Sequence, residues 1–210
     1  MEYFNEQQQV DQLKAWWKEY GMGVVGGVIL AIIIVLGIHF YARYETNKGQ
    51  QASSLYTMMM NSVLSDQRES AKASANQLIT KYAHTPYASI ARLWLAKNAA
   101  NSQNYTEANT QLTWVMEHAG MRSLRQVARI RDAQILLQQN NPTQALSVLT
   151  TLDDKGYKGL IDEVRAEAYI QMHEPDLART YYKKALDEIP SPTLSQPLLA
   201  MKLANLPAGN

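Results

Sequence analysis

The sequence predicts an all-α protein, with a single transmembrane helix near the amino terminus followed by a solenoid of paired helices. Three observations predict this fold class. Residues 21–41 contain no Asp, Glu, Lys or Arg. After them, apolar residues recur at spacings of three and four, as on one face of an α-helix. The breaks between these helical segments also recur, at intervals of nearly constant length.

The apolar stretch at residues 21–41 is long enough to cross a bilayer. At ~1.5 Å per residue, a helix of this length spans roughly 31 Å, about the thickness of the hydrocarbon core. Aromatic residues flank the stretch on both sides, among them Trp16 and Tyr44, as is typical of the two membrane interfaces. A cleaved signal sequence has a shorter apolar region and a small-residue cleavage site, which does not follow Tyr41. We therefore expect residues 21–41 to be a retained anchor in the lipid bilayer, with residues 1–20 on one side of it.

The charges that flank the anchor do not orient it. Lys14 and Lys18 precede the apolar stretch, and Arg43 and Lys48 follow it, so the count of positive residues is equal on the two sides. The residues alone leave the side of the membrane open.

Three small residues on the anchor predict a helix-packing ridge. Gly23, Gly27 and Ala31 are four residues apart, so they share one helix face. Small residues at this spacing let a second membrane helix approach closely. The alternative is that glycine is simply frequent in membrane helices.

The larger part of the chain reads as a water-soluble helical domain. The formal net charge is +1, cysteine is absent, and segments such as residues 126–139 are amphipathic at helical spacing. We expect a linker at residues 42–51, a repeat domain at 52–190 and a capping helix with a tail at 191–210. The cap is expected because a repeat array must cover its last apolar face.

Small residues reveal the repeat. Each second helix is expected to open with an alanine, and these alanines recur at steps of 37, 37 and 33 residues: Ala71, Ala108, Ala145 and Ala178. Twelve residues before each of the last three stands another alanine: Ala96, Ala133 and Ala166. Apolar residues or alanines follow four and seven positions later: Ala75 and Leu78, Leu112 and Val115, Leu149 and Leu152, Tyr182 and Ala185. Such a pattern indicates antiparallel helix pairs in close contact, each packed on the next pair.

This pattern resembles the tetratricopeptide repeat over residues 52–190, most closely in AEAYIQMHEPDLARTYYKKALDEIP. The resemblance implies a tetratricopeptide-like helical solenoid. Four positions depart from it. The large residue usual early in the first helix is Arg92, Arg129 or Asp162, and Met59 stands where a small residue is expected. The first pair is therefore the least regular, and a non-repetitive helical bundle remains the alternative.

In the repeat frame, the first helix of each pair faces a groove in which a protein partner would bind. The predicted groove residues are Ile90, Leu93, Lys97, Val127, Ile130, Gln134, Leu160, Glu163 and Glu167. The alternative is that Leu93 and Ile130 belong to the core. Tetratricopeptide domains that clamp a terminal carboxylate use Lys and Asn at two of these positions. Here the pair is Leu93 and Lys97, so that mode is not expected.

No residue pattern indicates catalysis or a bound cofactor. The chain has no cysteine nucleophile, and its four histidines lie too far apart in sequence for metal-ligand spacing. Asp153 and Asp154 are expected to be solvated. Arg125 and Arg129 share a helix face with other arginines, but the near-neutral charge favours a solvated or partner-facing rim over nucleic-acid binding. We therefore expect no enzyme, no cofactor, no metal, no nucleic acid and no small-molecule substrate.

The whole chain resembles the YfgM family of ancillary SecYEG translocon subunits. The resemblance rests on QVDQLKAWWKEYG before the anchor, the glycine-rich span, the irregular repeats and AMKLANL near the end. It implies an inner-membrane protein with residues 1–20 in the cytoplasm and the repeats in the periplasm. It also implies association with SecYEG and with the membrane-anchored chaperone PpiD, and a role in passing newly exported proteins to periplasmic folding factors. The alternative is a cell-envelope scaffold unrelated to translocation.

Overall fold

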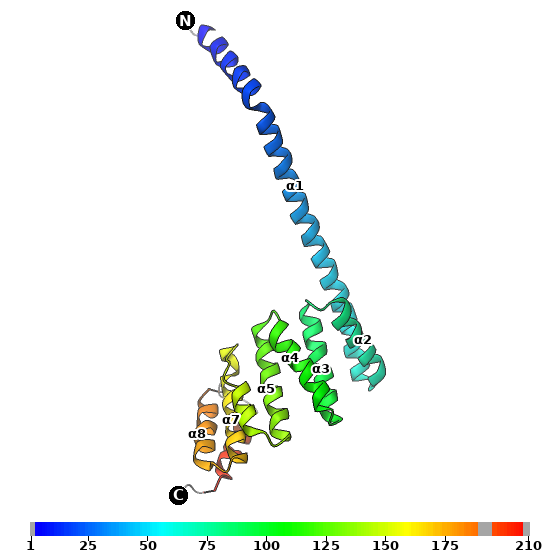
Figure 1. Ribbon diagram of the computed structural model, residues 1–210, viewed down its shortest axis with the longest axis vertical. Helices are drawn as coiled ribbons and strands as arrows, with labels where there is room; N and C mark the ends of the chain where they lie inside the picture. Colours follow the sequence, from blue (N-terminus) through cyan, green and yellow to red (C-terminus); the bar gives the residue numbers. More distant parts are fainter. Residues whose placement is uncertain (1–2, 189–194, 208–210) are drawn as a thin grey trace. The chain divides into compact units, whose positions relative to one another are not determined.

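The computed structural model describes residues 3–188 and 195–207 and divides the chain into two units, with the boundary between Gln51 and Ala52. Within these ranges every regular element is helical, so the all-α prediction is confirmed (Figure 1). The first helix, α1, runs from Tyr3 to Leu64. The helices after it are α2 (Arg68–Lys81), α3 (Pro86–Asn101), α4 (Tyr105–His118), α5 (Arg122–Gln138), α6 (Pro142–Val148), α7 (Lys158–Gln171), α8 (Pro175–Glu188) and α9 (Ser195–Ala204), with a 3₁₀ turn at Lys155–Tyr157.

The first unit is the amino-terminal part of α1. Among the described residues, α1 alone is long and apolar enough to cross a membrane. Its large apolar side chains are exposed throughout the span, as they must be on a helix that faces lipid or another membrane helix. The rings of Trp16 and Tyr20 lie 6.1 Å apart at the start of the span, and the Trp17 indole covers Gly21. This aromatic cluster is where an interfacial belt is expected.

Residues 42–51, predicted as a linker, are helical. They continue α1 from the apolar span into the first repeat helix without a break in the hydrogen-bonded backbone. This segment contains a single glycine, Gly49, and no proline, so no residue in it forces the helix to end.

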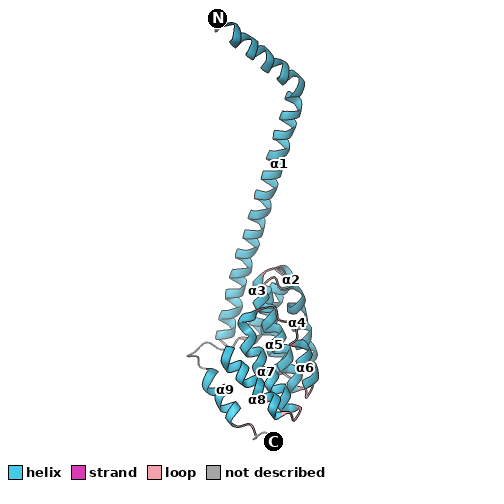
Figure 2. Ribbon diagram, turned by 90° about the vertical axis from the view of Figure 1, so that its left-hand side faces the viewer, coloured by secondary structure: helices cyan, strands magenta, loops and turns pink. Residues whose placement is uncertain are grey.

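The second unit is a series of helix pairs. The carboxyl-terminal end of α1 pairs with α2, α3 with α4, α5 with α6 and α7 with α8, and each pair contacts the next (Figures 1 and 2). Four apolar clusters, one centred on each pair, follow the chain from Ala52 to Leu206. The core is therefore a row of small clusters, as in a solenoid.

Every turn inside a pair has the same backbone geometry. The second residue after the first helix takes a left-handed conformation in each pair: Asp66 (φ 52°), Gln103 (φ 60°), Asn140 (φ 59°) and His173 (φ 59°). At the α3–α4 turn, the Gln103 amide donates to the Ala100 carbonyl and the Asn104 amide to the Ala99 carbonyl, both at 2.9 Å. The same two bonds recur at the other three turns. This pairing is the Schellman motif, which satisfies the free carbonyls at a helix end.

The left-handed residues are separated by 37, 37 and 33 positions, the same steps as the alanines that follow them five residues later. Seven alanines predicted at helix crossings are buried, with exposures of 0% or 1%: Ala71, Ala96, Ala108, Ala133, Ala145, Ala166 and Ala178. Because each is small, the backbones of the paired helices can approach closely. The turn and the alanine together define the repeat.

One position departs from the predicted repeat. Leu152, seven residues after Ala145, is 44% exposed, whereas Leu149 is fully buried. The cause is the short α6, which ends at Val148, so that Leu152 lies in the connection to α7. Met59, which stands at an expected small position, is itself fully buried in the first cluster.

The predicted capping helix corresponds to α9. It packs on α8 (Figure 2), with Leu199 at 1% exposure beside Tyr182 and Ala185. Residues 191–194 and 208–210 of the predicted cap segment lie outside the described residues.

Replacement of Gln103 by glycine should stabilise the repeat domain. A non-glycine residue in the left-handed region costs roughly 1–2 kcal/mol, and glycine removes this cost. Glycine also gives the unfolded chain more conformational entropy, which offsets part of the gain in stability. We expect a net gain of up to about 1 kcal/mol in the free energy of unfolding, measured by circular dichroism on the full chain in detergent. The control is Gln77→Gly on the exposed face of α2, which should lose about 1 kcal/mol. Equal losses in both variants would contradict the strain assigned to Gln103.

Candidate protein-binding groove

The first helices of three successive pairs, α3, α5 and α7, lie side by side, and two hollows follow their carboxyl-terminal halves. The first hollow has a volume of about 290 Å³ and lies between α3, α4 and α5. The second has a volume of about 590 Å³ and lies between α5 and α7. Gln134 and Gln138 line both hollows, so the hollows adjoin along these two side chains of α5, and together they make up the candidate groove.

Three of the nine predicted groove residues line this groove. Lys97 lies at the first hollow, Glu167 at the second and Gln134 at both. Leu93 and Ile130 are 5% and 7% exposed and belong to apolar clusters, which is the alternative that the sequence left open.

The remaining four predicted residues do not line the hollows. Val127 packs half-buried against the second cluster, and Ile90 is half-buried near the start of α3. Leu160 is 42% exposed near the start of α7. Glu163 lies one turn before Glu167 on α7 and is half-buried. A partner-binding role for the nine residues stays a prediction.

A lysine of the cap pairs with two acids of α7 at one end of the groove. The Lys202 ammonium of α9 donates to Glu163 at 2.8 Å and to Glu167 at 2.7 Å. Burial alone would lower the pKa of Lys202, but the hydrogen bonds to both carboxylates outweigh it and raise that pKa above its usual value. Two carboxylates share one ammonium, so this end of the groove keeps one net negative charge.

Sequence reasoning missed Arg131, Gln138 and Gln171 as groove residues. Gln138 and Gln171 each lie one helical turn beyond a residue that was predicted, Gln134 and Glu167. If the predicted groove positions had been continued by one more turn toward the carboxyl-terminal ends of α5 and α7, they would have included these two residues. No pattern in the sequence singles out Arg131, because its position depends on how α5 packs against α3.

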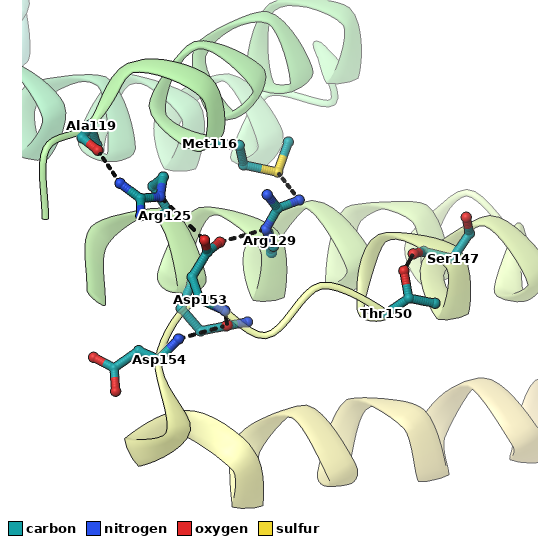
Figure 3. A network of polar contacts seen from close by, with 9 residues as sticks. Met116, Ala119, Arg125, Arg129, Ser147, Thr150, Asp153 and Asp154 are labelled. Atoms are coloured by element: carbon teal, nitrogen blue, oxygen red, sulfur yellow. Dashed lines mark hydrogen bonds and ion pairs between the residues drawn. The ribbon is translucent and has the colours of Figure 1, made fainter. Parts of the chain in front are cut away.

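On another face of α5, a polar network fixes the connection between α6 and α7 (Figure 3). Asp153 accepts hydrogen bonds from Arg125 at 3.2 Å and from Arg129 at 2.7 Å. The buried Gln126 side chain accepts a hydrogen bond from the backbone amide of Asp153 at 2.8 Å. Arg125 also donates a hydrogen bond to the Ala119 carbonyl. The structure therefore corrects the expectation that Asp153 and these arginines are solvated. They form a structural clamp instead.

The irregular repeat positions are occupied by charged residues that form polar contacts, one between helices and one within a helix. Arg92 stacks over the Trp114 ring at 4.1 Å and donates to Gln111 at 2.6 Å, which joins α3 to α4. Asp162, at 2% exposure, pairs with Arg165 at 2.9 Å. Charged groups with polar or aromatic partners replace the usual large apolar residue at these positions, although the buried Nε of Arg92 has no hydrogen-bond partner among the described residues. Within the described residues, no group of three or more His, Cys, Asp or Glu side chains could hold a metal ion.

Comparison with known proteins agrees with this architecture. The family model described as "Tetratricopeptide repeat-like domain" matches residues 14–208. The chain belongs to this family. The match begins before the anchor and extends through α9, so the family includes the anchor and the cap as well as the repeats.

Full-length relatives confirm the resemblance to the YfgM family. A protein of Neisseria gonorrhoeae is 27% identical over 97% of this chain and 98% of its own length. Proteins of Haemophilus influenzae and Escherichia coli are each 25% identical, over 96% and 97% of this chain and 97% and 98% of their own lengths. All three carry the name "Ancillary SecYEG translocon subunit".

Loss of the Asp153 charge should destabilise the repeat domain in a pH-dependent way. Burial would raise the pKa of Asp153, but the hydrogen bonds and charges of Arg129 and Arg125 hold it below its usual value. A depressed pKa contributes stability above about pH 4, and this contribution is lost as the pH falls through the pKa of the folded state. We expect Asp153→Asn to lower the free energy of unfolding at pH 7 by about 1–3 kcal/mol.

The measurement is chemical unfolding of both proteins across pH 3–7. The difference between wild type and Asp153→Asn should shrink as the pH falls below about 4. Asp187→Asn, on the exposed face of α8, is the control and should change stability by less than about 0.5 kcal/mol. A difference that stays constant with pH would rule out the charge of Asp153 as its origin.

Proposed function

We propose that this protein is a membrane-anchored, non-enzymatic adaptor that associates with the SecYEG translocon. The observation that carries the proposal is the end-to-end similarity to relatives named for that role, which extends over the anchor, repeats and cap. A helix that can cross the membrane and a groove between paired helices are the parts that such an adaptor needs. Repeat domains of this kind present extended surfaces for binding other proteins.

The finer assignment follows from the family resemblance. The protein lies in the bacterial inner membrane as a single-pass protein, with residues 1–20 in the cytoplasm and the repeats in the periplasm. There it binds a PpiD-like membrane chaperone and helps pass newly exported proteins to periplasmic folding factors. The absence of cysteine fits an oxidising compartment, although it does not require one.

The anchor is proposed to pack against translocon or chaperone helices through Gly23, Gly27 and Ala31. A side chain added at Gly23 or Gly27 meets no other atom within 4 Å, so this face of α1 is open to a partner helix. Van der Waals contact across small residues is a main source of helix association in lipid.

A carboxyl-terminal fusion tests the proposed orientation. We expect alkaline phosphatase fused after residue 210 to be active in cells, because the enzyme folds only outside the cytoplasm, and a fused green fluorescent protein exported through the same translocon to be dark. A fluorescent fusion together with an inactive phosphatase would place the repeats in the cytoplasm and refute the proposed role at the translocon exit.

Copurification tests the proposed partner and the ridge. From cells expressing the tagged full chain, mild detergent should retain SecYEG subunits. Gly27→Leu should reduce their yield about three- to tenfold by holding the partner helix away. Val25→Phe, about 160° around the helix from Gly27, adds volume outside the ridge and should leave the yield unchanged. Wild-type eluates that contain other envelope proteins but no SecYEG would instead support the scaffold alternative.

A further inference from the structure

The first hollow contains two positive charges and no negative one. Arg131 and Lys97 both line it, and neither forms an ion pair with any described residue. The remaining lining residues are small, apolar or neutral amides: Ala96, Ala100, Asn101, Leu112, Gln134, Ile135 and Gln138. The positive charge in the hollow is therefore not balanced from within it.

Arg131 is held in place by the fold. Its guanidinium donates to the Leu93 carbonyl of α3 at 3.2 Å, which fixes the side chain across the gap between α5 and α3. Burial lowers the pKa of Arg131, and no neighbouring acid opposes that shift. The guanidinium remains charged at neutral pH, since its usual pKa is above about 12. A half-buried cation without a counter-ion costs free energy that an incoming carboxylate would recover.

The acids on α5 and α7 do not line the first hollow. Asp132, which follows Arg131 in α5, interacts electrostatically with Arg129 and is 8% exposed. In the second hollow, Glu167 is bound by Lys202. The groove therefore presents two positive charges at the α3–α5 end and, at the α7 end, two carboxylates that share one ammonium.

The rest of the groove suits a polypeptide backbone. Leu112 and Ala96 give the first hollow an apolar floor, at 0% and 1% exposure. The amides of Gln134, Gln138 and Gln171 lead from there into the second hollow, and an amide side chain can both donate to and accept from a backbone. A lipid headgroup or a nucleic acid would leave this neutral amide row unused, and nucleic-acid binding usually requires a longer basic stripe.

We propose that this groove binds an extended acidic segment of a partner polypeptide, with an acidic side chain between Arg131 and Lys97 and the backbone along Gln134, Gln138 and Gln171. The span from α3 to α7 is about two helix spacings, or roughly 16–20 Å. An extended chain covers that distance in about five or six residues. This inference deepens the proposed adaptor function and rests on it for the identity of the partner.

The test is fluorescence anisotropy on the full chain in detergent, with labelled ten-residue peptides of Gly and Ser, of which the first two are blocked at both ends. One peptide carries Asp-Glu-Asp at its centre, a second carries Asn-Gln-Asn, and a third carries Asn-Gln-Asn with a free terminal carboxylate. We expect the acidic peptide to bind at least about tenfold more tightly than the amide peptide, and the affinity to fall with added salt. Equal binding of the first two peptides would overturn the proposal, and preference for the third would replace it with recognition of a chain terminus.

Variants assign the binding to the groove. Arg131→Gln and Lys97→Glu should each weaken binding of the acidic peptide about tenfold or more. Lys97 is exposed, so Lys97→Glu preserves the fold even if Arg131→Gln does not. Lys183→Glu, on the exposed face of α8, is the matched control and should bind like wild type. Unchanged affinity in Lys97→Glu, or inorganic phosphate alone displacing the peptide at equal concentration, would refute the site.

Copurification separates this inference from the proposed function. If SecYEG is retained by Lys97→Glu while acidic-peptide binding is lost, the groove serves a partner other than the translocon, and both proposals stand. If wild type binds the acidic peptide but never retains SecYEG, the adaptor proposal fails and the acidic-segment site remains.

Discussion

The close approach of paired helices is the constraint on which the repeat domain depends. A left-handed residue lies two positions after the end of each first helix, and five positions later a buried alanine opens the contact between the two helices of the pair. The turn fixes where the second helix begins, and the alanine fixes how near it can lie. Neither is sufficient alone, because a wide turn would separate the helices and a large side chain would hold them apart.

The groove is a consequence of that packing. Because each second helix lies close against its own first helix, the first helices of successive pairs become neighbours, and α3, α5 and α7 line one surface. Their last turns leave two hollows that share Gln134 and Gln138. The position of the groove therefore depends on the backbone repeat, whereas its chemistry depends on residues that the repeat leaves free to vary.

This difference explains what the sequence could predict. The alanine spacing is a local pattern that reports packing directly, and it predicted the helix pairs. The cap segment in which α9 lies was expected because a repeat array must cover its last apolar face. Short-range patterns do not report long-range polar pairs. Asp153 meets Arg129 across 24 residues of chain, so its place in a clamp was not visible in the sequence. Leu152 was misplaced because α6 stops after seven residues, with no proline or glycine to mark its end.

The same argument applies to the site. Lys97, Gln134 and Glu167 were predicted from the repeat frame and do line the groove, whereas Leu93 and Ile130 share the frame and are buried. The repeat frame predicts which face of each first helix points toward the groove. Whether a residue on that face is buried or exposed depends on which neighbouring helices cover it. The cap supplies the clearest case: Lys202 of α9 pairs with both Glu163 and Glu167 of α7. Without that lysine the α7 end of the groove would carry two negative charges instead of one. With it, the positive charges of Arg131 and Lys97 outnumber the negative charge that remains, so the carboxyl-terminal helix influences which partner chemistry the repeats can accept.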